Sequence, residues 1–203
     1  MNPISLIHGR YVHLRRVDVL GERMGSLLPD NAVVLDVGCG DGRLAQAIQS
    51  RRAGVSVVGI DVHVRAGTAV PVTGFDGAHI PYPDRSFDAV IFADVLHHTE
   101  DPMVLLREAA RTTRRYVLIK DHVLQGVMAR QTLRLMDEVA NRRHGIALPF
   151  NYWTRAQWDA AFAAAGMAVD EWVGTLGLYP WPARLWFERS LHFVARLRAR
   201  AKT

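Results

Sequence analysis

A run of alternating glycines, VVLDVGCGDGRLAQAI at residues 33–48, constrains this chain more than any other feature. A strand that ends around Asp36 leads into glycine at every second position, Gly38, Gly40 and Gly42, and a helix follows at once. Glycine permits sharp turns and close approach, so backbone N–H groups and a helix N-terminus can face a ligand there. A merely tight strand–helix turn would not need three glycines, and we predict a ligand-binding turn.

The chemistry of that ligand is indicated by the acid that precedes the glycines. A dinucleotide fingerprint would place its third glycine at position 43, which is Arg43 here. The carboxylate of Asp36 would repel a pyrophosphate and suits a ligand that carries an ammonium or a sulfonium. A nicotinamide-dependent dehydrogenase, the nearest rival among enzymes, is therefore disfavoured.

Short apolar runs alternate with helical stretches along the rest of the chain. This alternation predicts a parallel sheet covered by helices. The expected helices are 14–28, 41–51, 102–112 and 154–165, the last with Thr154 as N-cap. The expected strands are Val33–Val37, Val55–Ile60, Val70–Thr73, Ala89–Ala93, Tyr116–Ile119 and Ala168–Val173. The segment SLHFVARLR fits a helix or a strand, and its cleaner period of two favours a strand.

Bulk properties narrow the class of protein. A length of 203 residues predicts a single domain. One cysteine, Cys39, excludes an intramolecular disulfide framework. We expect neither a signal peptide nor a membrane span, and hence a cytoplasmic location. The net charge of +5 lies in residues 184–203, where six cations face Glu188 alone, so no basic stripe favours nucleic acid.

Two further acids follow the next strands. Asp61 ends the second strand, where a carboxylate can accept both hydroxyls of a ribose. Asp76 is expected to end the third strand, where it could receive an exocyclic amine such as that of adenine. With Asp36, three acids at the carboxyl ends of consecutive strands agree with a nucleoside site at one edge of an open sheet.

The chain resembles the class I S-adenosylmethionine-dependent methyltransferases, in the group of small-molecule enzymes that share the type 11 methyltransferase domain. Three segments within residues 30–120 carry the resemblance, and the closing LHFVARLR resembles the last antiparallel strand of that fold. The three segments are VVLDVGCGDGRLA, VVGID and FDGAHIPYPDRSFDAVIFADVLHHTEDP.

The resemblance implies a fold and a set of cofactor contacts. The fold is α/β, a Rossmann-like open twisted sheet, mostly parallel with an antiparallel last strand and helices on both faces. The loop after the second strand is too short for the helix usual there. For S-adenosylmethionine, with S-adenosylhomocysteine as product, the implied contacts are Asp36, Gly38, Gly40 and Gly42 in the loop, Asp61 and Val62 at the ribose, Asp76 and Gly77 at the adenine, and Ala93 and Asp94 at the methionine.

A histidine pair follows the fourth strand. If a helical turn begins there, Asp94, His97 and His98 share one face and could present a general base to an acceptor. Alternatively, the two histidines could have a structural role alone, as caps of the turn. Isoprenoid-quinone O-methyltransferases, which the chain resembles, use an acid-rich version of this turn for a divalent ion. Since His97 replaces the second acid, we assign no metal ligand.

Polar residues also follow the fifth strand. Asp121 is a candidate substrate contact and His122 a third candidate base. The insertion that follows is expected to form a lid, with His144 as a candidate substrate residue on the same helical face as Asp137 and Asn141.

The aromatic segment LYPWPARLWF, residues 178–187, has three open interpretations. It could pack in the core, cover a hydrophobic acceptor through Trp181, or touch a membrane surface with the basic C-terminal residues.

These features predict an enzyme that moves a methyl group to a small molecule by in-line displacement, with a hydroxyl oxygen as the favoured acceptor because histidines are available to deprotonate it. A protein that binds S-adenosylmethionine without catalysis remains an alternative. We expect one domain, residues 1–203, comprising an N-terminal helical segment (1–30), a cofactor-binding core (31–120), a lid (121–153) and a C-terminal part (154–203).

Overall fold

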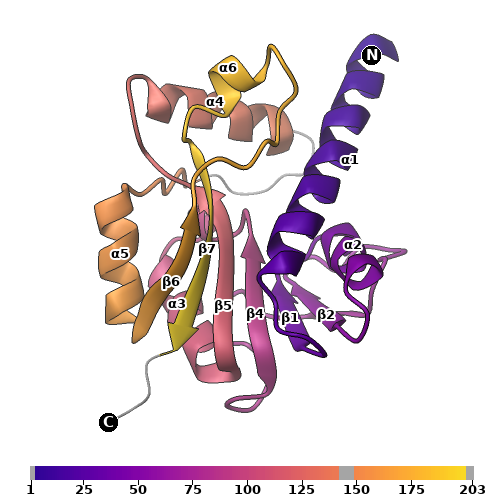
Figure 1. Cartoon of the computed structure of the whole chain (residues 1–203), viewed down its shortest axis with the longest axis vertical. Helices are drawn as coiled ribbons and strands as arrows, with labels where there is room; N and C mark the ends of the chain where they lie inside the picture. The colour runs from indigo at the N-terminus through magenta and orange to yellow at the C-terminus, as the bar shows by residue number, and fades with distance from the viewer. Residues whose placement is uncertain (1–2, 142–148, 200–203) are drawn as a thin grey trace.

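The computed structural model describes residues 3–141 and 149–199, and their strands form one open seven-stranded sheet (Figure 1). The strand order is β3-β2-β1-β4-β5-β7-β6. The first five strands pair in parallel, whereas β7 runs antiparallel to both of its neighbours. The strands are β1 (Val33–Val37), β2 (Ser56–Asp61), β3 (Val72–Gly74), β4 (Phe87–Ala93), β5 (Thr113–His122), β6 (Met167–Val173) and β7 (His192–Ala199).

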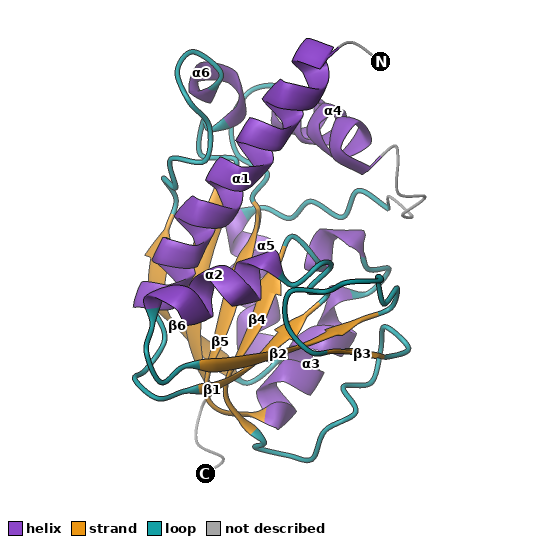
Figure 2. Cartoon of the chain, turned by 90° about the vertical axis from the view of Figure 1, so that its right-hand side faces the viewer, coloured by secondary structure: helices purple, strands orange, loops and turns teal. Residues whose placement is uncertain are grey.

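Helices cover both faces of this sheet, as Figure 2 shows from the side. Helices α1 (Pro3–Ser26) and α2 (Arg43–Arg51) pack on one face, where Leu20, Met24 and Ile48 join a core with Val34 and Leu118. Helices α3 (Pro102–Thr112) and α5 (Arg155–Ala164) cover the other face. Strand residues alternate between the two cores, which is the period of two that the sequence displays.

The predicted fold class is confirmed, and its elements agree in order with those expected. SLHFVARLR forms strand β7, so the helical interpretation was wrong. The described residues 62–71 contain no helix, in agreement with the short loop expected there. Three expectations need correction. The first helix, expected at 14–28, covers Pro3–Ser26. β5 extends to His122, because neighbouring strands supply partners along its whole length, and β3 ends at Gly74, so Asp76 lies in the following loop.

The predicted turn with two histidines is a 3-10 helix, η1 (Leu96–His98). Beyond the carboxyl ends of the parallel strands lie α4 (Ala129–Asn141) and the short α6 (Arg184–Phe187) (Figure 1). Helix α4 belongs to the predicted lid. The candidate substrate residue His144 lies outside the described residues.

None of the helices in the described part of the chain is both long and apolar enough to cross a bilayer.

The N-cap of α5 allows a first prediction, about stability. The Thr154 hydroxyl accepts the Gln157 backbone N–H, and the Gln157 side chain accepts that of Thr154, a reciprocal capping box. We expect Thr154→Ala to lower the free energy of unfolding by about 1 kcal/mol, measured by urea denaturation. Thr154→Ser keeps a hydroxyl and serves as the control; equal stability of all three proteins would contradict a stabilising cap.

Candidate functional site

The glycine turn between β1 and α2 has a backbone conformation that only glycine adopts easily. Gly38 and Gly42 adopt left-handed φ angles of 71° and 73°. A Cβ atom on Gly38 would lie 2.6 Å from Val95 Cγ2, so any larger residue at position 38 would have to displace Val95. The Gly40 N–H donates to Asp61 Oδ2 at 2.8 Å. The turn therefore depends on glycine conformation and on a carboxylate from the next strand.

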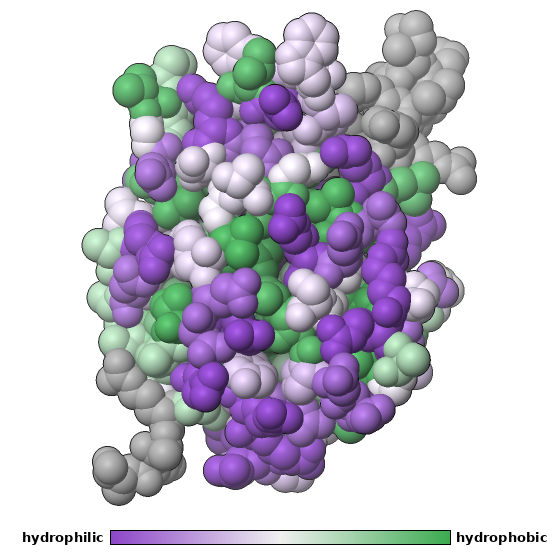
Figure 3. All heavy atoms as spheres, in the orientation of Figure 1, coloured by the Kyte–Doolittle hydropathy of each residue, from purple (hydrophilic) through white to green (hydrophobic). Residues whose placement is uncertain are grey.

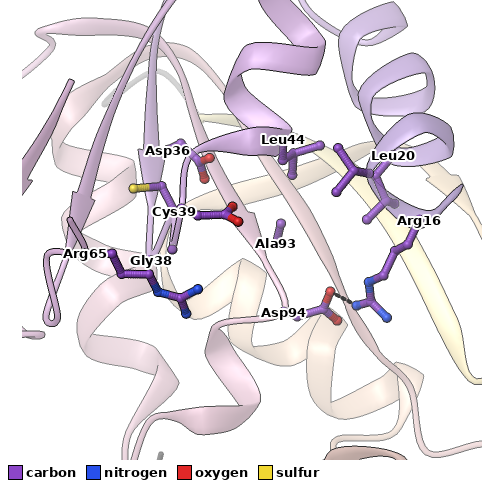
Figure 4. Close-up of a pocket in the computed structure, with 12 residues that line it drawn as sticks. Arg16, Leu20, Asp36, Gly38, Cys39, Leu44, Arg65, Ala93 and Asp94 are labelled. Carbon is purple, nitrogen blue, oxygen red and sulfur yellow. Dashed lines mark hydrogen bonds and ion pairs between the residues drawn. The ribbon is translucent and has the colours of Figure 1, made fainter. Parts of the chain in front are cut away.

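A cavity of about 210 Å³ lies against this turn (Figure 4). Its lining includes Arg16, Asp36, Gly38, Ala93 and Asp94. Asp36 is 2% exposed, and its Oδ1 atom has no hydrogen-bond partner among the described residues. Burial, with a smaller contribution from Asp61, raises the pKa of Asp36 to about 7. The cavity thus contains a buried acceptor that a cationic ligand would satisfy.

A network of ion pairs closes the other side of the cavity. The Arg16 guanidinium, from α1, and the Lys120 ammonium, from β5, both contact the carboxylate of Asp94 (Figure 4 shows the pair with Arg16). Lys120 is fully buried, and burial together with the nearby Arg16 charge lowers its pKa to about 8 despite Asp94. Asp94 thus lines the cavity, follows the end of β4 and pairs with Lys120 of β5.

Beyond Asp94, a buried histidine sits between two carboxylates. His97 Nδ1 lies 2.6 Å from Asp121 Oδ1, and His97 Nε2 lies 3.5 Å from Asp137 Oδ2 in α4. The Tyr152 hydroxyl donates to the same Asp137 oxygen. Burial lowers the pKa of His97, but the two carboxylates outweigh it and raise the pKa to about 10. His97 is therefore an imidazolium at neutral pH.

The neighbouring histidines are shifted in the opposite direction. Burial and the charge on His97 lower the pKa of both His98 and His122 to about 4. His122 is 3% exposed, whereas His98 is half-buried. Two neutral imidazoles thus flank one cation, and only the neutral ones can accept a proton at pH 7.

A family model described as a methyltransferase domain matches residues 8–171. This chain belongs to the methyltransferase domain family. The resemblance to class I S-adenosylmethionine-dependent methyltransferases is confirmed, and S-adenosylmethionine is the cofactor of this family.

Relatives and solved structures agree with this membership. The 27-O-demethylrifamycin SV methyltransferase of Amycolatopsis mediterranei is 36% identical over 47% of this chain and 40% of its own length. The ubiquinone biosynthesis O-methyltransferase of Sodalis glossinidius is 29% identical over 50% and 44%. The chain therefore spans about two fifths of the length of these relatives. The YcgJ protein of Bacillus subtilis shares the fold, with a TM-score of 0.67, 17% identity, and coverage of 90% of this chain and 99% of that one.

The residues of the methyltransferase cavity fit S-adenosylmethionine. The unpartnered Asp36 oxygen suits the α-ammonium of the cofactor, and the Arg16 guanidinium suits its carboxylate (Figure 4). Gly38 leaves room where a Cβ would clash. The donor set and the buried orphan acceptor therefore match the two charges of the methionine moiety.

The structure brings some of the predicted cofactor residues together around this cavity. Asp36, Gly38, Gly40, Ala93 and Asp94 all line it. Gly42 instead forms the N-cap of α2.

The residues predicted to contact the ribose and the adenine lie further along the sheet edge. Asp61 uses its carboxylate to accept N–H groups from Gly40 and His63. A Cβ on Gly77 would lie 3.1 Å from Val62 Cγ1, so these two residues adjoin. The exposed carboxylate of Asp76 accepts backbone N–H groups of its own loop, which together with His79 lower its pKa to about 2. Their roles at the ribose and adenine stay predictions.

Sequence reasoning missed the residues that other elements bring to the site. Arg16 and Lys120 belong to a helix and a strand distant from the glycine motif, and no spacing pattern singles them out. Asp137 was noted only as part of a helical face. Strand-end acids were detectable because they follow apolar runs, whereas these partners are defined only by tertiary pairing.

Two groups of described side chains have the spacing of ligands for a divalent ion. They are Asp94–His97–His122 and His97–His98–Asp137, each with ligand atoms within 4.8 Å of one another. In the first group, Asp94 already pairs with the side chains of Arg16 and Lys120. In the second group, His97 Nε2 and His98 Nδ1 are buried and make no hydrogen bond to described residues. His97 belongs to both groups, and as an imidazolium it has no electron pair for a metal, so an ion at either group would first have to displace its proton.

Asp61→Ala tests the ribose contact. Losing charge-assisted hydrogen bonds should weaken S-adenosylmethionine binding by about 1.5–3 kcal/mol, measured by titration calorimetry. Asp159→Ala, an exposed carboxylate on α5, is the control. Unchanged affinity would show that Asp61 does not hold the ribose.

Cofactor affinity should depend on the protonation of Asp36. Because the pKa of Asp36 is about 7 without cofactor, the carboxyl is mostly protonated below that pH, and only its ionised form pairs with an ammonium. We expect the Kd to fall by up to about tenfold per pH unit as the pH rises from about 5.5 and to level off above about 7. Asp36→Asn should bind weakly at every pH. A slope that persists in this variant would assign the titration to another group.

Proposed function

We propose that this domain transfers the methyl group of S-adenosylmethionine to a hydroxyl oxygen of a small, hydrophobic acceptor. The observation that carries the proposal is the neutral imidazole of His98, four residues beyond the cavity residue Asp94. The bound cofactor supplies a methyl already activated on a sulfonium. The chain must then exclude water, align the acceptor oxygen opposite the sulfur, and remove the hydroxyl proton.

Among the three candidate bases, His98 is supported best. His97 is held as a cation by Asp121 and Asp137, so it has no free electron pair to accept a proton. His122 is neutral but 3% exposed, and its Nδ1 faces the Nδ1 of His97 at 3.4 Å. His98 is neutral and half-buried, which leaves it reachable by an acceptor.

The other members of the cluster are better suited to positioning. Asp121 is fully buried and accepts hydrogen bonds from the backbone N–H groups of Leu96 and His122. Its predicted contact with substrate is untested, but these bonds favour a role in orienting η1 and His97. In the proposed reaction, the oxygen–methyl bond forms as the sulfur–methyl bond breaks, and the hydroxyl proton passes to His98.

The named relatives favour an oxygen acceptor. The ubiquinone enzyme is an O-methyltransferase by name, and the other relative is named for a 27-O-demethyl substrate, although the match covers less than half of each. A binding protein without catalysis is the second candidate. Trp181, predicted as a substrate contact, is 74% exposed and does not line the cavity. Formation of S-adenosylhomocysteine with a panel of phenols, quinols and macrocyclic alcohols would separate the two.

Replacing His98 tests the proposed base. His98→Ala should lower kcat by about 10²–10⁴-fold, the usual contribution of a general base, and leave the Kd for S-adenosylmethionine unchanged. Added imidazole should restore part of kcat in this variant. An equal loss of cofactor affinity, or an unchanged kcat, would show that His98 is structural.

A further inference from the structure

Exposed apolar side chains are concentrated at one end of the molecule. Of twelve large hydrophobic residues exposed in the described part of the chain, four lie at residues 127–139 and three at 181–186. The first segment exposes Val127, Met128, Leu135 and Val139. The second exposes Trp181, Leu185 and Trp186, with Trp181 at 74% and Trp186 at 68%.

The two segments form a single surface. The Arg189 guanidinium, just beyond α6, donates to the Thr132 hydroxyl of α4 at 3.1 Å. Leu133 of α4 and Leu191 share one buried cluster beneath them. Both views place α4 and α6 at the same end of the molecule, beyond the carboxyl ends of the parallel strands (Figures 1 and 2). We call the exposed side chains of residues 127–139 and 181–189 the cap face.

Hydrogen bonds at both ends hold the backbone of the segment that exposes Trp181 and Trp186. The Glu188 carboxylate accepts backbone N–H groups of residues 176–179, which fixes the start of the segment. His192 Nε2 contacts the Phe187 carbonyl oxygen at 2.9 Å and fixes the end. The backbone is thus attached to the body while Trp181 and Trp186 face solvent. Figure 3 shows apolar and hydrophilic atoms interspersed at this upper edge.

The charges of the cap face are predominantly positive. Its exposed ionised side chains in the described segments are Arg130, Arg134, Arg184 and Arg189 against Glu138 alone. Two copies of such a face would repel each other. Tryptophan suits the boundary between water and hydrocarbon, because its ring is apolar and its N–H is polar, and arginine pairs with phosphate.

We propose that the cap face binds the surface of an anionic lipid bilayer. Trp181, Trp186 and Leu185 enter at the depth of the headgroups, and the arginines pair with lipid phosphates. This orientation places the carboxyl ends of the parallel strands, with the cofactor cavity, toward the membrane. If the proposed function holds, a hydrophobic acceptor would reach the site from that side.

Vesicle flotation with the whole chain tests the proposal and needs no turnover. The protein should float with vesicles of phosphatidylcholine and phosphatidylglycerol, bind pure phosphatidylcholine vesicles far less, and dissociate as salt is raised. Brominated lipids should quench the tryptophan fluorescence. Trp181→Ala with Trp186→Ala should weaken binding about tenfold and remove the quenching, and Arg130→Gln with Arg184→Gln should weaken it about tenfold and reduce the salt dependence.

Controls keep the result specific. Val104→Ala with Arg107→Gln changes an exposed apolar residue and an exposed arginine on α3 and should bind vesicles as the unchanged protein does. Calorimetry with S-adenosylmethionine should give unaltered affinity for the cap-face variants, which shows that they fold. Failure to bind either vesicle type, equal binding by all variants, or a dimer in sedimentation velocity that the tryptophan variant dissociates would overturn the proposal. The first of these results would leave the proposed methyl transfer intact.

Discussion

The contacts of the half-buried Asp94 carboxylate with Arg16 and with the buried Lys120 are the interaction on which the rest of the site depends. Lys120 loses its hydration and the other two ions lose part of theirs, and pairing with the opposite charge compensates for that loss. Without the carboxylate, two cations would face each other beside the cavity. Asp94 adopts a left-handed φ of 60°, which aspartate tolerates better than most residues. The pairing holds α1 against the ends of β4 and β5, and so forms the cavity wall opposite the glycine turn.

The same alternation of charge continues away from the cavity and gives the histidines different protonation states. His97 lies between the carboxylates of Asp121 and Asp137, which keep it protonated. Its charge, added to burial, lowers the pKa of His98 and His122. Burial and one neighbouring imidazolium together keep His98 and His122 neutral, because a further buried positive charge beside His97 is unfavourable. The neutral state of His98, the base proposed above, therefore depends in part on where His97 is placed.

The sequence was sufficient for features whose cause is local, and insufficient for those with a tertiary cause. Alternating apolar residues predicted the strands, and the glycines predicted a turn that needs left-handed backbone. Thr154 as N-cap was legible because Gln157 completes the box three residues later. By contrast, the extent of β5 depends on partner strands, and the place of Asp76 depends on where β3 loses its neighbour. Arg16 and Asp137 reach the site from helices whose packing no motif records. The predicted helical turn at His97 is a 3-10 turn, and Asp121 contacts both the His97 ring and the Leu96 N–H.

Helix α4 connects the cap face to this chemistry, because its two sides have different tasks. Its inner side buries Leu133 and presents Asp137 to His97, while its outer side exposes Leu135 and Val139. A membrane bound at the outer side, as proposed, would hold the helix that presents Asp137 to the imidazolium. Binding at one side of an element is coupled to pairing at the other, and such coupling is reciprocal. Docking of the cap face, as proposed, would therefore bear on the same helix that presents Asp137 to His97.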